Sequence, residues 1–211
     1  RITSVKMQTS ILHSRDPLND YRLIIDTHPA VHKKIALLKT AFDLGFKGLV
    51  IAGGNPFIYL ATFSQHESKE LLMLDALHRV AMGFMPFKIH LKNFGRIDNQ
   101  EIFVKVGEQE TIEYLVSQIK AAEGLMVDAR FNDLPRITLA QRLQPWQFDK
   151  SWPEYSHKQL AATFLAGQML LLKRMEGFRS WQVLKHMAFQ NQYIGPLQPG
   201  NGSVAFGGVR L

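Results

Sequence analysis

The chain has 211 residues, of which 46% are hydrophobic and 20% are charged, and it contains no cysteine. This composition is that of an ordinary globular protein and excludes a disordered chain, a collagen-like chain and a disulfide-rich miniprotein. No apolar run approaches the roughly 20 residues that a membrane span needs. The 25 basic and 18 acidic residues give a net charge of +7, which favours a partner that carries phosphate groups. Charge alone does not separate nucleic acid, nucleotide and membrane surface.

Periodicity predicts the elements of the first half, after an irregular arm at residues 1–19. We expect strands at 21–26 and 57–63, a helix at 28–42 and a turn at 52–56. Ser64 and Glu67 have the spacing of a capping box, so the next helix is expected to begin there and to continue through 71–80.

The second half alternates strands and helices in the same way. In chain order, we expect strands at 87–94 and 100–106, a helix at 109–121, a strand at 135–141, a short helix at 146–155, and a terminal antiparallel pair formed by 158–173 and 181–189. A tail rich in Gly and Pro follows. The chain then divides into an arm at 1–19, one bilobal domain at 20–191 and a tail at 192–211.

Strands and helices mix without a steady βαβ rhythm, which predicts an α+β fold with antiparallel sheets backed by helices. Because side chains alternate across a strand, one set points inward: Ile58, Leu60, Ile89, Leu91, Ile102, Val104, Ile137 and Leu139. The open face then receives a basic and aromatic set: Phe57, Tyr59, Lys88, His90, Lys92, Phe103, Lys105, Arg136 and Thr138.

Two segments resemble the signature strands of the two-histidine phosphoesterases, in the branch called 2'-5' RNA ligase-like. They are PFIYLATF at 56–63 and PRITLAQRLQPWQFDKSWPEY at 135–155, and the flanks at 81–95 and 151–174 agree with the same family. The resemblance covers roughly residues 21–191. It implies two pseudo-symmetric lobes of antiparallel sheet with a central cleft, and a phosphodiesterase or ligase activity on RNA 2',3'-cyclic or 2'-5' linkages.

The family carries a His-x-Thr motif on each of two facing strands, with one imidazole as general base and the other as general acid. Here the matching positions read Phe57-Ile58-Tyr59 and Arg136-Ile137-Thr138. Phenylalanine has no proton to exchange, and an arginine stays protonated at neutral pH. Losing each proton-transfer group costs about 10²–10⁴-fold in rate, so the resemblance implies a degenerate member that is catalytically impaired.

A cleft suited to phosphate is still expected at this position. Arg136 offers a planar fork of donors, while Tyr59 and Thr138 add hydroxyl groups. Phe57 or Phe103 would stack a base, and Lys88, His90, Lys92 and Lys105 would add positive field. The expected partner is RNA or a nucleotide rather than a membrane. We expect no metal and no cofactor, a cytoplasmic location by default, and make no prediction of the oligomeric state.

Each of these residues also has a structural interpretation. Arg136 would equally pair with an acidic side chain on a neighbouring strand, Phe57 and Tyr59 would equally pack into a closed cleft, and the face of Lys88, His90 and Lys92 is typical of a solvated strand. Three functions therefore stay open. The first is a non-catalytic nucleotide or RNA binder, and the second is an altered phosphodiesterase that uses Tyr59 and a water, with His90 as a further recruit. The third is an interaction module whose cleft is filled, for example by residues 190–211.

Overall fold

The computed structural model describes residues 15–46 and 55–193, whose strands form two antiparallel sheets. The first sheet has the order β5 (Val127–Phe131), β2 (Ile58–His66), β1 (Leu18–Ile25), β8 (Gln168–Arg174) and β9 (Gln182–Ala188). The second sheet has the order β6 (Arg136–Ala140), β4 (Glu101–Val106), β3 (Phe87–Ile97) and β7 (Ala161–Ala166).

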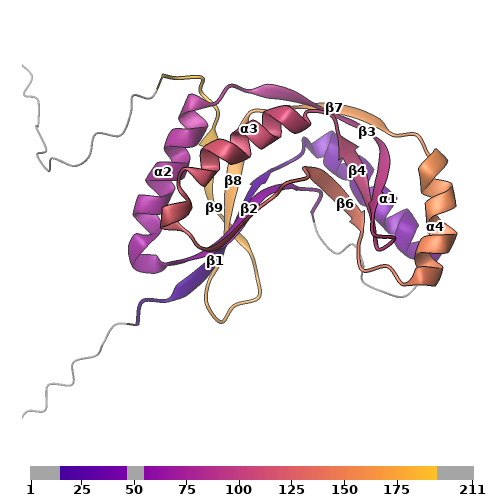
Figure 1. The fold of residues 1–211 in the computed structure, drawn as a ribbon, viewed down its shortest axis with the longest axis horizontal. Helices are drawn as coiled ribbons and strands as arrows, with labels where there is room; N and C mark the ends of the chain where they lie inside the picture. The colour runs from indigo at the N-terminus through magenta and orange to yellow at the C-terminus, as the bar shows by residue number, and fades with distance from the viewer. Residues whose placement is uncertain (1–14, 47–54, 194–211) are drawn as a thin grey trace, which may run out of the picture.

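Two helices cover each sheet. Helices α2 (Glu70–Gly83) and α3 (Gln109–Lys120) pack against β9 and β2 of the first sheet, while α1 (Pro29–Phe46) and α4 (Pro145–His157) pack against the second sheet. The two layered lobes join in an arch (Figure 1). This arrangement confirms the predicted α+β fold of two lobes with a central cleft. No helix in the described ranges is long and apolar enough to cross a membrane.

The alternation of the sequence accounts for the core. Every residue expected to point inward from β2, β3, β4 and β6 is buried, and one continuous cluster joins both sheets to their helices. On α3, the residues spaced at i, i+3, i+4 and i+7 are also buried: Ile112, Leu115, Val116 and Ile119. Burial of one side of each sheet leaves the other side open toward the cleft.

The expected helix start at Ser64 is wrong. Strand β2 continues to His66, because Ser64 pairs with Asp20 on β1 and donates a hydrogen bond of 2.8 Å to its carboxylate. A short 3-10 turn at Glu67–Lys69 follows, and α2 begins at Glu70. The capping-box spacing was a coincidence of polar residues at the end of a strand.

Three further boundaries differ from the prediction. Leu18 and Asn19 already belong to β1, so the irregular arm is shorter than expected, and β5 was not predicted. The segment 158–173 is not one strand but two: β7 pairs with β3 in the second sheet, and β8 pairs with β1 and β9 in the first. The β8–β9 pair confirms the terminal hairpin.

Candidate ligand site in the central cleft

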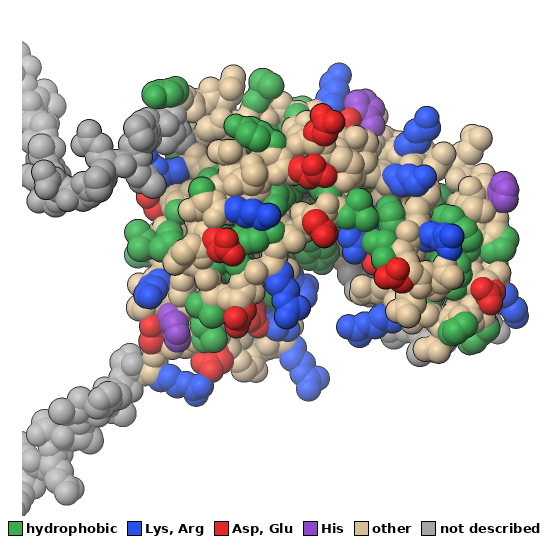
Figure 2. All heavy atoms as spheres, in the orientation of Figure 1, with side chains coloured by type: hydrophobic (Ala, Val, Ile, Leu, Met, Phe, Trp, Pro, Cys, Tyr) green, Lys and Arg blue, Asp and Glu red, His purple; other side chains and the backbone are tan. Residues whose placement is uncertain are grey.

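The two motif strands belong to different sheets but begin side by side. Asn132 lies between β5 and β6, directly after the end of β5, and it donates from its backbone N to Leu60 O at 2.9 Å and from its side chain to Tyr59 O at 2.7 Å. The motif positions of β2 and β6 are thereby brought to the centre of the arch. Figure 2 shows the hollow between the two lobes, with Lys and Arg side chains on both of its sides.

On β2, the motif positions are packed into an apolar cluster. Phe57 and Tyr59 are half-buried, with ring centroids 6.4 Å apart, and they pack with Trp181 against three buried side chains of β1 and β8: Ile24, Leu170 and Leu172. This cluster contains no histidine. The packing interpretation of Phe57 and Tyr59 is therefore present in the structure.

On β6, the motif positions are bonded to a carboxylate. Arg136 Nε donates to Glu101 Oε1 at 2.7 Å and Nη2 donates to Glu101 Oε2 at 3.2 Å, while Thr138 Oγ1 donates to Glu101 Oε1 at 2.8 Å. The side chains of Arg136 and Glu101 are only 24% and 14% exposed. The alternative of a structural ion pair is thus the one that the structure contains, and the pair is electrically neutral.

Phe103 lies on the open face of β4 but is only 8% exposed, so it is less open to a base than predicted. Its ring occupies the space above Gly95 on β3, where an added Cβ would come within 2.5 Å of Phe103 Cζ. The Arg136 guanidinium carbon lies 5.8 Å from the ring centroid. The Phe103 ring therefore packs against the guanidinium group of Arg136.

The lysines of the second sheet keep the open face that the sequence predicts. Lys88, Lys92 and Lys105 are exposed and form no ion pair in the described part of the chain. His90 differs, because Glu108 accepts a hydrogen bond of 2.7 Å from its backbone N and contacts its ring Nδ1. The positive field of this wall comes from the lysines rather than from His90.

Residues that the sequence reasoning missed line a cavity of about 440 Å³ on the open face of the first sheet. They include Arg22, Arg130, Arg174 and Trp181. The alternation of side chains along β1 could have placed Arg22 on the open face. Arg130 could not be placed in this way, because it lies on β5, the strand that was not predicted.

Asp20 lines this cavity, and its carboxylate accepts hydrogen bonds from two neighbouring side chains. Arg174 Nη2 donates to its Oδ2 at 2.6 Å, and Ser64 donates to its Oδ1. Partial burial raises the pKa of Asp20, but the hydrogen bonds from Arg174 and Ser64 outweigh it and hold the pKa below its ordinary value. Asp20 is therefore ionised at neutral pH, and Arg174 compensates its charge.

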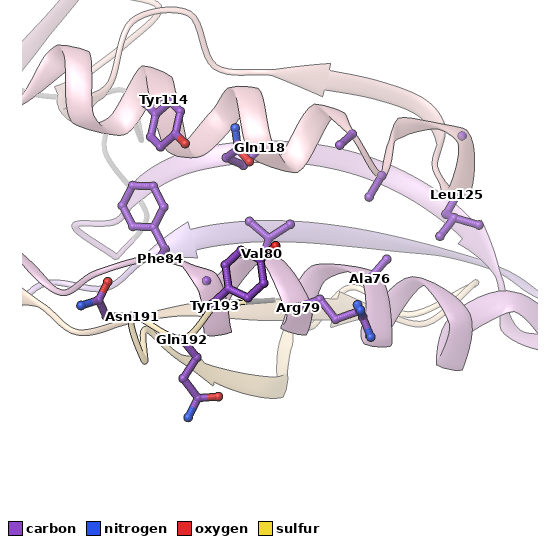
Figure 3. Close-up of a pocket in the computed structure, with 14 residues that line it drawn as sticks. Ala76, Arg79, Val80, Phe84, Tyr114, Gln118, Leu125, Asn191, Gln192 and Tyr193 are labelled. Carbon is purple, nitrogen blue, oxygen red and sulfur yellow. The ribbon is translucent and has the colours of Figure 1, made fainter. Parts of the chain in front are cut away.

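A larger cavity of about 960 Å³ lies between α2 and α3, on the side of the first sheet away from the cleft. Figure 3 shows Val80 of α2 and Phe84, which directly follows α2, on the side of the cavity opposite Tyr114 of α3. Arg79 is the only charged side chain among the described residues that line it. This apolar cavity does not suit a phosphate, and it contains none of the predicted site residues.

Comparison with known proteins agrees with the fold. Residues 51–177 match the family model described as the 2'-5' RNA ligase superfamily, and no curated protein matches the chain. A crystal structure of the Thermus thermophilus protein TT0787 is similar with a TM-score of 0.63 at 18% identity, over 82% of this chain and 100% of that chain. Escherichia coli LigT complexed with 3'-AMP gives a TM-score of 0.58 at 14% identity, over 82% of this chain and 98% of that chain. Because the family match spans more than half of the sequence, this chain belongs to the 2'-5' RNA ligase superfamily.

Proposed function

We propose that the chain binds a phosphate-bearing nucleotide or an RNA end in its central cleft without two-histidine catalysis. The observation that carries this proposal is the distribution of charge. Two acids of the walls, Asp20 and Glu101, are each paired with an arginine, at 2.6 and 2.7 Å, and Asp128 is a further acid on the first wall. Lysines and arginines on both walls keep no acidic partner in the described residues: Arg22, Arg130, Lys88, Lys92 and Lys105.

The proposed loss of catalysis follows from the two motif positions. Phe57 carries no ionisable group, and Arg136 stays protonated at neutral pH and donates to Glu101. An altered phosphodiesterase that recruits His90 is disfavoured, because β4 separates β3 from β6 and places His90 about 10 Å from the motif strand. His90 is in addition held by Glu108.

The solved relatives support the class of ligand. Crystal structures of E. coli LigT have been determined in complex with 3'-AMP, phosphate, NADP+ and ATP. Each of these molecules carries phosphate, which is the chemistry that unpaired lysines and arginines recognise. We also propose that RNA is the partner and that the protein is cytoplasmic.

A second candidate is a non-catalytic interaction module whose cleft is filled. It is favoured by the packing of Phe57 and Tyr59 against Ile24, Leu170 and Leu172, which occupies part of the first wall. The expected filling of the cleft concerns the tail at 190–211. Its first residues lie beside the end of α2, where Asn191 N donates to Phe84 O at 2.9 Å, and residues 194–211 lie outside the described ranges. A filled cleft would leave the protein indifferent to nucleotides.

Binding of 3'-AMP and of a short 3'-phosphorylated RNA, measured by calorimetry at low and high salt, tests the proposed function. We expect binding that weakens with salt, because displaced counterions accompany each phosphate contact. Lys105→Gln is expected to weaken binding about threefold to tenfold, while Lys33→Gln on the outward side of α1 serves as control. Absence of binding at low salt would favour the interaction module, and hydrolysis of 2',3'-cyclic nucleotides at about 1 s⁻¹ or faster would contradict the loss of catalysis.

A further inference from the structure

The cavity of about 960 Å³ between α2 and α3, called here the α2–α3 groove, presents apolar surface to solvent. Val80 and Phe84 line one side of it, and Tyr114 and Leu125 line the other (Figure 3). Tyr114 is 59% exposed although it lies over this apolar lining. Contiguous apolar surface of this kind marks a place where another apolar surface docks.

The charges of the lining restrict what fits there. Among the described residues that line the α2–α3 groove, Arg79 is the single charged side chain and none is acidic. The remaining polar groups are amides and the Tyr114 hydroxyl. The volume is at the upper end of the range that holds a drug-sized molecule, so several apolar side chains fit. The groove therefore suits an apolar segment of chain without acidic residues.

The chain that follows β9 is fastened at the end of α2. The Phe189 ring packs against Phe84 with centroids 5.4 Å apart. Beyond it, Asn191 N donates to Phe84 O at 2.9 Å, and Gln192 N donates to Met82 O at 2.8 Å. Met82 lies in the last turn of α2, where carbonyl oxygens have no partner within the helix. These two hydrogen bonds fix the chain beside the groove.

A turn at Asn191 then directs the chain into the α2–α3 groove. Asn191 has a φ of 51°, in the left-handed region that asparagine adopts more readily than most residues. Gln192 and Tyr193 follow, and both are among the residues that line the groove (Figure 3). Residue 194 therefore starts from the groove and not from the central cleft.

The sequence beyond Tyr193 matches the chemistry of the groove. Residues 194–211 contain no acidic residue, and Arg210 is their single charged side chain. Their large apolar side chains are Ile194, Leu197, Val204, Phe206, Val209 and Leu211. This segment is apolar enough to cover the lining and carries no group that would have to be buried as an anion.

We infer that residues 194–211 dock in the α2–α3 groove of their own chain rather than in the central cleft. Attachment at Tyr193 gives this segment an effective concentration in the millimolar range at the groove. A second copy of the chain or a separate apolar partner at micromolar concentration competes poorly with it. The inference does not rest on the proposed function, and it leaves the central cleft open to a ligand.

Chemical cross-linking tests this docking, because the chain has no native cysteine. Ala121→Cys places a thiol on the groove lining, and Ala205→Cys places one beside Phe206. Position 205 is far enough along the chain to lie up to about 40 Å from Tyr193, so proximity in sequence does not force the reaction. Lys105→Cys with Ala205→Cys, on the wall of the central cleft, is the control pair. With a short bismaleimide and dilute protein, we expect the groove pair to cross-link within one chain at least about tenfold faster than the control pair.

Two variants of the segment, made in the groove pair, test whether apolar contacts hold it. Leu197→Ser/Phe206→Ser should slow cross-linking at least about fivefold, whereas Gln198→Ser/Asn201→Ser should leave the rate unchanged within about twofold. Equal slowing by both variants would overturn apolar docking.

Three other outcomes of the cross-linking would overturn the inference. Equal rates for the two cysteine pairs would mean that the segment does not dock. Faster reaction of the control pair would place the segment in the central cleft. A cross-link that joins two chains would show that the groove takes the segment of a second copy.

Discussion

The side chains at the two motif positions are held by opposite kinds of contact. On β2, Phe57 and Tyr59 join an apolar cluster with Ile24, whereas on β6 Arg136 and Thr138 share the carboxylate of Glu101. Either arrangement leaves no buried side-chain polar atom without a partner at the motif positions, which would be costly when shielded from water. The comparison shows that matching strands in two similar lobes need not hold their cleft-facing side chains by the same kind of contact.

The largest expected effect is a gain of phosphodiesterase activity. The triple variant Phe57→His/Tyr59→Thr/Arg136→His places an imidazole at each motif position, and Glu101 stays available to orient the one on β6. We expect this variant to hydrolyse 2',3'-cyclic nucleotides at a rate at least about 10²-fold above that of the native chain. Chromatography of the product measures the rate. The double variant that lacks Arg136→His is the control, and a folded triple variant with no gain would show that the two walls are no longer aligned.

Breaking the ion pair between Arg136 and Glu101 should lower the stability of the fold. Arg136→Ala leaves the Glu101 carboxylate, which is 14% exposed, without its guanidinium partner. We expect the free energy of unfolding in urea to fall by about 2 kcal/mol. Arg130→Ala, which removes an unpaired exposed arginine, should change it by less than about 0.5 kcal/mol. Similar values for the two variants would mean that the Arg136–Glu101 pair is not a structural contact.

Disrupting the apolar cluster of Phe57 and Tyr59 should lower the free energy of unfolding by less than breaking the Arg136–Glu101 pair does. This loss should not depend on the salt concentration. Phe57→His/Tyr59→Thr deletes half-buried aromatic surface beside Leu170 and Leu172, for an expected loss of about 1–2 kcal/mol in unfolding free energy. Phe178→His, in an exposed loop, is the matched control. If high salt changes the cost on β2 as much as on β6, the two walls do not differ in kind.

The smallest effect concerns pH and the first wall. The folded pKa of Asp20 lies below its ordinary value of 3.8, so its contribution to stability is present above pH 3.8 and is lost as the pH falls through the folded value. Asp20→Asn should therefore destabilise the protein at pH 7 by less than about 1 kcal/mol, and the difference should vanish in acid. Urea unfolding at several pH values, with the exposed Asp75→Asn as control, measures it.

Sequence periodicity located most elements because the alternate residues expected to point inward on β3, β4 and β6 are all buried. It failed where tertiary pairing decides the structure. Ser64 belongs to a strand because Asp20 lies opposite, and β7 separates from β8 because each pairs with a different sheet. The same limit applies to the site: a period of 2 counted from Tyr59 points Thr62 inward, and only the bulge against β1 turns it outward beside Arg22 and Arg130.

The order in which the chain visits the two lobes has a consequence for unfolding. The first sheet takes β1, β2, β5, β8 and β9, while the second takes β3, β4, β6 and β7, so the chain crosses between lobes repeatedly. Asp20 on β1 meets Arg174 on β8, and no single cut of the backbone frees one lobe from the other. The lobes therefore cannot melt independently, and the molecule should lose its structure in one cooperative transition with slow refolding, because contacts distant in sequence must form first.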